Sequence, residues 1–201
     1  MWNTSNGQCP PRFLRHHAIG VVNLARLTGC TTLLPTSLLV CCTLPESELL
    51  SGIECQDGLR EQLSPADAQL CSNAKSKLTI ARVAIGLRVF NPRASRNCSY
   101  SYGTTGNYDP DRERLFDVLD RFADTLKDPQ HEAEAAALCR PDPSASFVPL
   151  FEELLSSSNK TSLCRDCAKM INMRDVDERR KVWKDIPALL GITVEGWGRL
   201  Q

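Results

Sequence analysis

The chain has 201 residues, of which 42% are hydrophobic and 24% are charged, values typical of an ordinary globular protein. Lys and Arg total 24, as do Asp and Glu, so the net charge is zero and gives no electrostatic reason to expect binding to nucleic acid or an anionic membrane. The first residues lack the apolar run of a signal peptide, and the most apolar window, 33–44, is too short to span a bilayer. We therefore expect an intracellular protein, in the cytoplasm or nucleus, that binds neither nucleic acid nor membrane.

The ten cysteines are scattered through apolar helical patterns and show no regular spacing. In a reducing compartment, such cysteines are expected to be free thiols that pack as small hydrophobic side chains.

Residues 1–14 contain Pro10-Pro11 in a polar start, which predicts a flexible lead-in. Residues 15–91 are expected to form an N-terminal helical lobe around the apolar stretch 18–52. There we expect Gly29 and Gly52 to end helices, and Pro35 to occupy the first turn of one. The first helix has an apolar stripe at helical spacing, consisting of Ala18, Val21, Val22 and Ala25, widened by Ile19, Leu24 and Leu27.

Ser64-Pro65 predicts the start of a long helix that runs to Asn91-Pro92, because Ser is a good cap and Pro fits the first helical position. Its end, 80–90, also resembles a strand, and a break near Gly86 is an alternative. The segment 92–108 has no apolar period and is predicted to be a polar loop between two lobes. Its Tyr100 and Tyr102 are candidate partner-binding residues, with simple anchoring of the loop as the alternative.

Residues 109–198 are expected to form a C-terminal helical lobe. Asp109-Pro110 predicts the start of a helix with an apolar stripe, and a last long helix follows from residue 161, with Pro187 and Gly191 at its end. The fold class is therefore all-α, with seven or eight helices in an orthogonal or solenoid-like pack.

Cys164 and Cys167 lie three residues apart, a spacing that places two thiols on one helix face. They can share a zinc ion, act as a redox pair, or simply pack in the core. A zinc site needs further ligands: Cys139 is the candidate third thiolate, and His131 qualifies as a fourth only if its helix folds back. The cofactor prediction is thus no cofactor, with zinc on Cys139, Cys164 and Cys167 as the alternative.

The final helix carries a stretch of mixed charge in which Asp175 with Arg179 and Asp177 with Lys181 are spaced for ion pairs. A solvated helix face is one interpretation; the other is a partner-binding surface made of Arg179, Arg180, Lys181 and Trp183. The sequence contains no nucleophile-elbow, metalloprotease, Walker or Rossmann pattern. We accordingly expect a protein that is not an enzyme.

Three segments together resemble a known family: AIGVVNLARLTGCTTLLPTSLLVCC, LSPADAQLC after DG-x-x-E, and LC-x-x-C with ERRKVWKDIPALLGI. They are similar to the helical region that follows the BTB/POZ domain in basidiomycete fungal proteins. The resemblance implies a non-enzymatic protein-interaction or scaffold role with a protein partner. The BTB/POZ part is absent from this sequence, so the chain is expected to be either a fragment of a longer adaptor or a helical region that stands alone.

Overall fold

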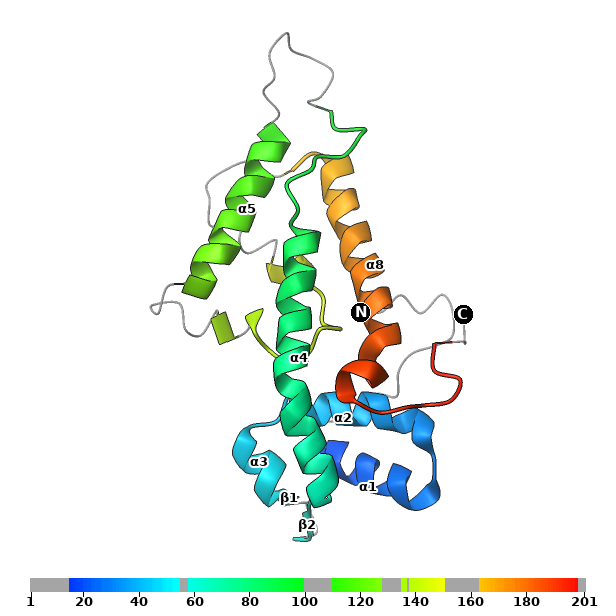
Figure 1. Ribbon diagram of the computed structural model, residues 1–201. Coiled ribbons are helices and arrows are strands. Elements are labelled where there is room, and N and C mark those ends of the chain that lie inside the picture. Colours follow the sequence, from blue (N-terminus) through cyan, green and yellow to red (C-terminus); the bar gives the residue numbers. More distant parts are fainter. Residues whose placement is uncertain are drawn as a thin grey trace. The chain divides into compact units, whose positions relative to one another are not determined.

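The computed structural model describes residues 15–54, 58–99, 110–127, 135–136, 138–150 and 163–198 (Figure 1). Within these ranges the regular structure is helical apart from one two-stranded sheet, which confirms the all-α prediction. Searched over the same ranges, the chain has no helix that combines the length and hydrophobicity needed to cross a membrane. The predicted lead-in, 1–14, lies outside the described residues.

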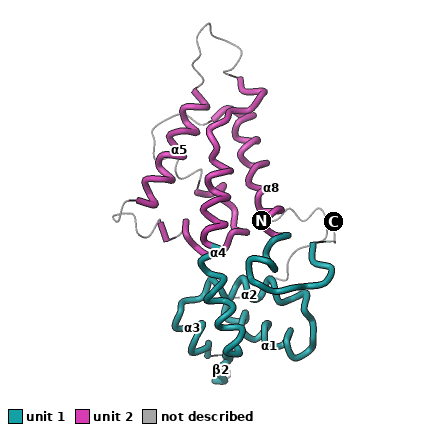
Figure 2. The backbone as a smooth tube through the Cα atoms, in the orientation of Figure 1, with its two compact units in different colours: residues 1–78, 184–201 teal, residues 79–183 magenta. Residues whose placement is uncertain are grey.

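The chain forms two compact units: unit 1 contains residues 1–78 and 184–201, and unit 2 contains 79–183 (Figure 2). The divisions fall inside two long helices, α4 (Pro65–Val89) and α8 (Arg165–Leu190). The predicted boundary, the polar loop 92–108, falls instead within the residue range of unit 2. The boundary predicted at this loop differs from the observed division, because each of the two long helices contributes residues to both units.

Unit 1 begins with a 3-10 turn (η2, Arg15–His17) and α1 (Ala18–Thr28), which packs against α2 (Leu34–Cys42). A second 3-10 turn (η3, Thr31–Leu33) joins these two helices, and α3 (Glu46–Ser51) follows. The short strands β1 (Ile53–Glu54) and β2 (Arg60–Glu61) pair antiparallel, with Ile53 opposite Glu61.

The expected helix ends of unit 1 are confirmed. Gly29 has φ of 70° and closes α1, and Gly52 has φ of 81° after α3, a backbone region that favours glycine. Pro35 lies in the first turn of α2. The apolar stripe of α1 is narrower than predicted, because Leu24 and Leu27 are 55% and 85% exposed.

The start of α4 is also as predicted. The hydroxyl of Ser64 accepts a hydrogen bond from the backbone N–H of Asp67 at 3.1 Å, which satisfies a donor of the first turn. The Asp67 carboxylate forms an ion pair with Arg26 of α1 at 2.6 Å, joining the two helices. Beyond this start the helix continues through Gly86 without a break.

Three thiols of unit 1 belong to its core, whereas the thiol-bearing Cys30 is exposed. Cys41, Cys42 and Cys71 are fully buried and free. Cys42 Sγ donates to the carbonyl of Cys71 at 3.7 Å, and burial raises the pKa of Cys41. These three cysteines therefore pack as small hydrophobic residues, as the sequence predicts.

Unit 2 is built around three aromatic rings. Phe90, Phe122 of α5 (Pro110–Lys127) and Phe147 are fully buried and pack edge to face, with ring centres 5.5 to 6.3 Å apart. Gly86 allows this packing, because a Cβ atom at this position would lie 2.6 Å from the Phe122 ring.

Asp175 of α8 is a buried charged residue whose carboxylate accepts several hydrogen bonds. Its carboxylate accepts hydrogen bonds from the backbone N–H of Phe147 at 2.8 Å, the Ser146 hydroxyl at 2.9 Å and Arg179 Nε at 2.9 Å. The predicted pair of Asp175 and Arg179 is thus confirmed, but in the core of the unit. Pro187 does not end α8, which continues to Leu190 before Gly191.

Candidate metal centre

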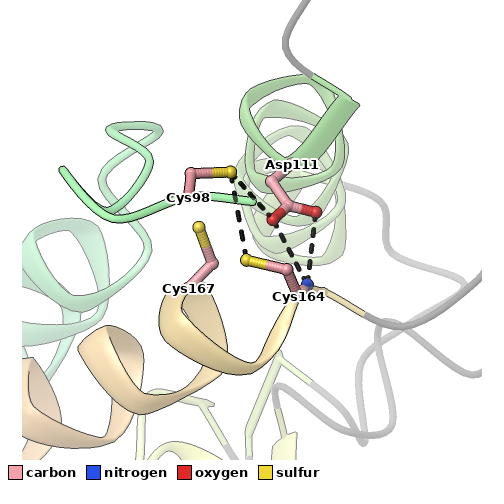
Figure 3. Close-up of side chains that lie close together, drawn as sticks. All are labelled: Cys98, Asp111, Cys164 and Cys167. Atoms are coloured by element: carbon pink, nitrogen blue, oxygen red, sulfur yellow. Dashed lines mark hydrogen bonds between the residues drawn. The ribbon is translucent and has the colours of Figure 1, made fainter. Parts of the chain in front are cut away.

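Four side chains with metal-binding atoms meet in unit 2: Cys98, Asp111, Cys164 and Cys167, here called the thiol–carboxylate cluster (Figure 3). Their ligand atoms, three sulfurs and a carboxylate oxygen, all lie within 4.8 Å of one another. Within the described residues, no disulfide forms among the three thiols.

Three separate segments supply these side chains. Cys98 ends a turn in which its backbone N–H bonds to the carbonyl of Ser95 at 3.0 Å. Asp111 lies in the first turn of α5, where Pro110 opens the helix without losing a hydrogen bond. Cys164 immediately precedes α8 and Cys167 follows in its first turn, so their spacing of three residues puts both sulfurs on one side.

The cluster therefore sits at the amino-terminal ends of two helices, α5 and α8. Unpaired backbone N–H groups give a helix amino terminus partial positive charge, which stabilises thiolates and carboxylates. The backbone N–H of Cys164 points at Asp111, 3.2 Å from Oδ2 and 3.4 Å from Oδ1. The helix geometry thus favours negative charge where the four ligand atoms meet.

The spacing of the ligand atoms matches tetrahedral zinc. With Zn–S bonds of about 2.3 Å, two sulfurs of a tetrahedral site lie about 3.8 Å apart, and a sulfur and a carboxylate oxygen about 3.5 Å apart. The sulfurs of Cys98 and Cys164 are 3.9 Å apart, and Cys98 Sγ lies 3.3 Å from Asp111 Oδ2. These two distances are close to those of a tetrahedral zinc site, and every other pair of ligand atoms lies within 4.8 Å.

The cluster is largely shielded from water. Cys98, Asp111 and Cys167 are fully buried, and Cys164 is half-buried. Burial raises the pKa of the Cys167 thiol, and its hydrogen bonds with Asp111 act in the same direction. Burial would also raise the pKa of Asp111, but hydrogen bonds from Cys164, Cys167 and Cys98 outweigh it and hold that pKa below the usual value. In the absence of metal, these directions favour an ionised Asp111 carboxylate beside a protonated Cys167 thiol.

Neighbouring groups orient the ligands. Arg114 donates to Asp111 Oδ1 at 2.8 Å, which leaves Oδ2 facing Cys98. The backbone N–H of Ser95 donates to Cys167 Sγ at 3.3 Å, an interaction that stabilises a thiolate. Arg174 also interacts electrostatically with Cys167. Three thiolates and a carboxylate around Zn²⁺ keep excess negative charge, which these two guanidinium groups offset.

The sequence-predicted zinc ligands are thus brought together only in part. Cys164 and Cys167 are in the cluster, whereas Cys139 is not among its members: its carbonyl accepts a hydrogen bond from Thr79 at 3.0 Å and its side chain is half-buried. His131 lies outside the described residues. The structure adds Cys98 and Asp111, which sequence reasoning missed. The available signal was Cys98 itself, a cysteine in a polar loop where apolar packing does not explain it.

The predicted partner-binding residues differ in their exposure and in the contacts that they make. Arg179 is only 7% exposed and pairs with Asp175, so its assignment to a partner-binding surface is corrected: a buried ion pair occupies its guanidinium. Arg180 and Lys181 are exposed, and each pairs three residues back, with Asp177 and Glu178. Trp183 is half-buried. Tyr100 and Tyr102 lie outside the described residues.

No protein-family model, curated protein or solved structure matches this chain. The resemblance to the helical region of BTB/POZ proteins therefore stays a prediction.

Proposed function

We propose that unit 2 is a structural-zinc module, in which Cys98, Asp111, Cys164 and Cys167 hold one Zn²⁺. The observation that carries this proposal is the separation of 3.9 Å between the sulfurs of Cys98 and Cys164, which suits two ligands of one tetrahedral ion. Thiolate sulfur also selects zinc over magnesium or calcium, which prefer oxygen ligands.

A structural role is favoured over a catalytic one because four protein ligands close the coordination sphere. Catalytic zinc sites keep a position open for water or substrate. The ligands come from three segments between residues 98 and 167, so binding of the ion holds these segments together. The chemistry of such a site is to stabilise a fold, which agrees with the prediction of a non-enzymatic interaction or scaffold protein.

The test is the metal content of untagged protein purified under reducing conditions without chelator. We expect about one zinc per chain, as for a single closed four-ligand site. Cys164→Ser should lose this zinc, whereas Cys139→Ser should retain it. The two substitutions are matched, because both remove a half-buried thiol. Equal zinc content in the two variants would contradict the assignment.

Unfolding of Cys164→Ser alone does not decide the matter, so a second measurement uses the unmodified chain. Removing zinc with a chelator should lower the melting temperature by about 10 °C, and adding zinc back should restore it, because an ion bound to the folded state stabilises it. A chain that purifies without metal and whose melting temperature does not respond to added zinc would overturn the proposal.

A further inference from the structure

A surface pocket of about 550 Å³ lies in unit 2. Its lining residues are close in sequence to Cys98 and Asp111 of the thiol–carboxylate cluster. Residues 91–96, which follow α4 in Figure 1, form part of its lining, and Arg112 and Phe116 of α5 form the rest. It is called the arginine pocket here, because three of its lining residues are Arg93, Arg96 and Arg112.

Arg93 and Arg96 give the pocket positive charge that no carboxylate of the described residues pairs with. Arg93 and Arg96 are exposed, and no carboxylate of the described ranges lies within ion-pair distance of either guanidinium. Arg112 lies over the ring of Phe116, with its guanidinium carbon 5.6 Å from the ring centre. Phe116 is itself 42% exposed, so an apolar surface adjoins the charged one.

The backbone that carries Arg93 and Arg96 is held in place. Arg174 of α8 donates to the carbonyls of Asn91 at 2.7 Å and Arg93 at 2.9 Å. The N–H of Ser95 bonds to the sulfur of Cys167. A lining fixed in this way loses little conformational freedom when a ligand binds, which favours affinity.

From these observations we propose that the arginine pocket binds the phosphate of a phosphorylated serine or threonine in a protein partner. Guanidinium groups bind phosphate oxygens through paired hydrogen bonds, and a phosphate carries the negative charge that Arg93 and Arg96 can match. Phe116 provides an apolar contact for the residue next to the phosphorylated one. An open pocket with charged side chains suits a side chain of a polypeptide better than a small molecule, which usually buries most of its surface.

This inference rests on the zinc proposal in one respect: zinc bound by Cys98 and Cys167 would fix both ends of the turn that carries Ser95 and Arg96. Arg93 and Arg96 do not bind the metal, so the two proposals can fail separately.

The test measures binding of the zinc-loaded chain to a degenerate peptide library with a central phosphoserine or phosphothreonine, using the unphosphorylated library as the reference. We expect at least about tenfold preference for the phosphorylated library, and loss of that preference in Arg93→Glu/Arg96→Glu. Lys169→Glu/Lys184→Glu is the matched control: it reverses two exposed charges on α8 outside the pocket and should bind as the parent does.

Phe116→Ala keeps every charge and should remove the preference for an apolar residue beside the phosphate. Equal binding of the two libraries, or equal losses in the two charge-reversal variants, would overturn the proposal. So would binding of ATP or inorganic phosphate without binding of the phosphopeptides. Zinc content is measured on every sample: a full complement of zinc with no phosphopeptide binding refutes the pocket alone, whereas a zinc-free chain refutes the metal site.

Discussion

The sulfur atoms of Cys98 and Cys164 lie 3.9 Å apart, although 66 residues separate them in the sequence. The Cys164 thiol donates a hydrogen bond to the Cys98 sulfur over this distance, and two sulfur ligands of one tetrahedral zinc ion adopt nearly the same separation. The buried Asp111 beside them, with its lowered pKa, supplies the negative charge that a cation would balance. This relationship underlies the metal-site proposal.

Arg114 is expected to tune metal affinity without being a ligand. It holds Oδ1 of Asp111 at 2.8 Å, so Arg114→Gln should weaken zinc binding by about 10- to 100-fold while leaving the stoichiometry unchanged. Competition with a zinc-binding dye measures the affinity. Arg112→Gln, which changes an exposed arginine on the same helix, is the control. Equal affinities in the two variants would show that the hydrogen bond from Arg114 does not support the carboxylate.

Zinc binding should weaken steeply as pH falls. Burial raises the pKa of Cys167, so in the metal-free chain this thiol is protonated near neutral pH and must release its proton to bind the ion. The ionised Asp111 contributes no proton. Calorimetry in buffers of different ionisation enthalpy should therefore detect release of up to about three protons per zinc. Affinity that does not change between about pH 6 and 8 would exclude thiolate ligands.

Gly86→Ala should destabilise the protein by about 1–3 kcal/mol, because the added methyl group would overlap the Phe122 ring in a filled core. Gly20→Ala is the matched substitution in α1, where the methyl group would meet only the movable end of the Glu61 side chain. Because alanine favours helix over glycine, Gly20→Ala should be neutral or stabilising by up to about 1 kcal/mol. Urea unfolding gives both values, and an equal effect of the two substitutions would contradict the described packing.

Asp175→Ala should cost about 3–5 kcal/mol, since it leaves the buried guanidinium of Arg179 without its partner. Asp177→Ala, two residues further along α8, removes an exposed ion pair with Arg180 and should cost less than about 1 kcal/mol. Chemical denaturation again measures the difference. If both substitutions prove equally mild, the Asp175–Arg179 pair is not buried.

Local features of the fold could be predicted from sequence because they depend on neighbouring residues. Gly29 and Gly52 end their helices through a backbone conformation that glycine favours, and Ser64 caps α4 through its own side chain. Features that depend on tertiary contacts could not be predicted from the sequence in this way. Leu24 and Leu27 fit an apolar stripe but stay exposed, and Pro187 lies inside α8.

Two of the four residues of the candidate metal site could be predicted from the sequence, because their proximity depends on local spacing. Cys164 and Cys167 are close in sequence, so helical periodicity alone brings their sulfurs together. Cys98 and Asp111 join them only because α5 and the turn before it pack near the start of α8, which no local pattern encodes. For Arg179, the spacing from Asp175 predicted the ion pair correctly. The spacing did not predict that the pair is buried.

X-ray absorption at the zinc edge, on untagged protein purified without chelator, identifies the ligand atoms of the proposed metal site. We expect a first shell of about three sulfurs at about 2.3 Å and one oxygen at about 2.0–2.2 Å. A shell made only of nitrogen and oxygen, or no bound zinc at all, would contradict the metal-site proposal.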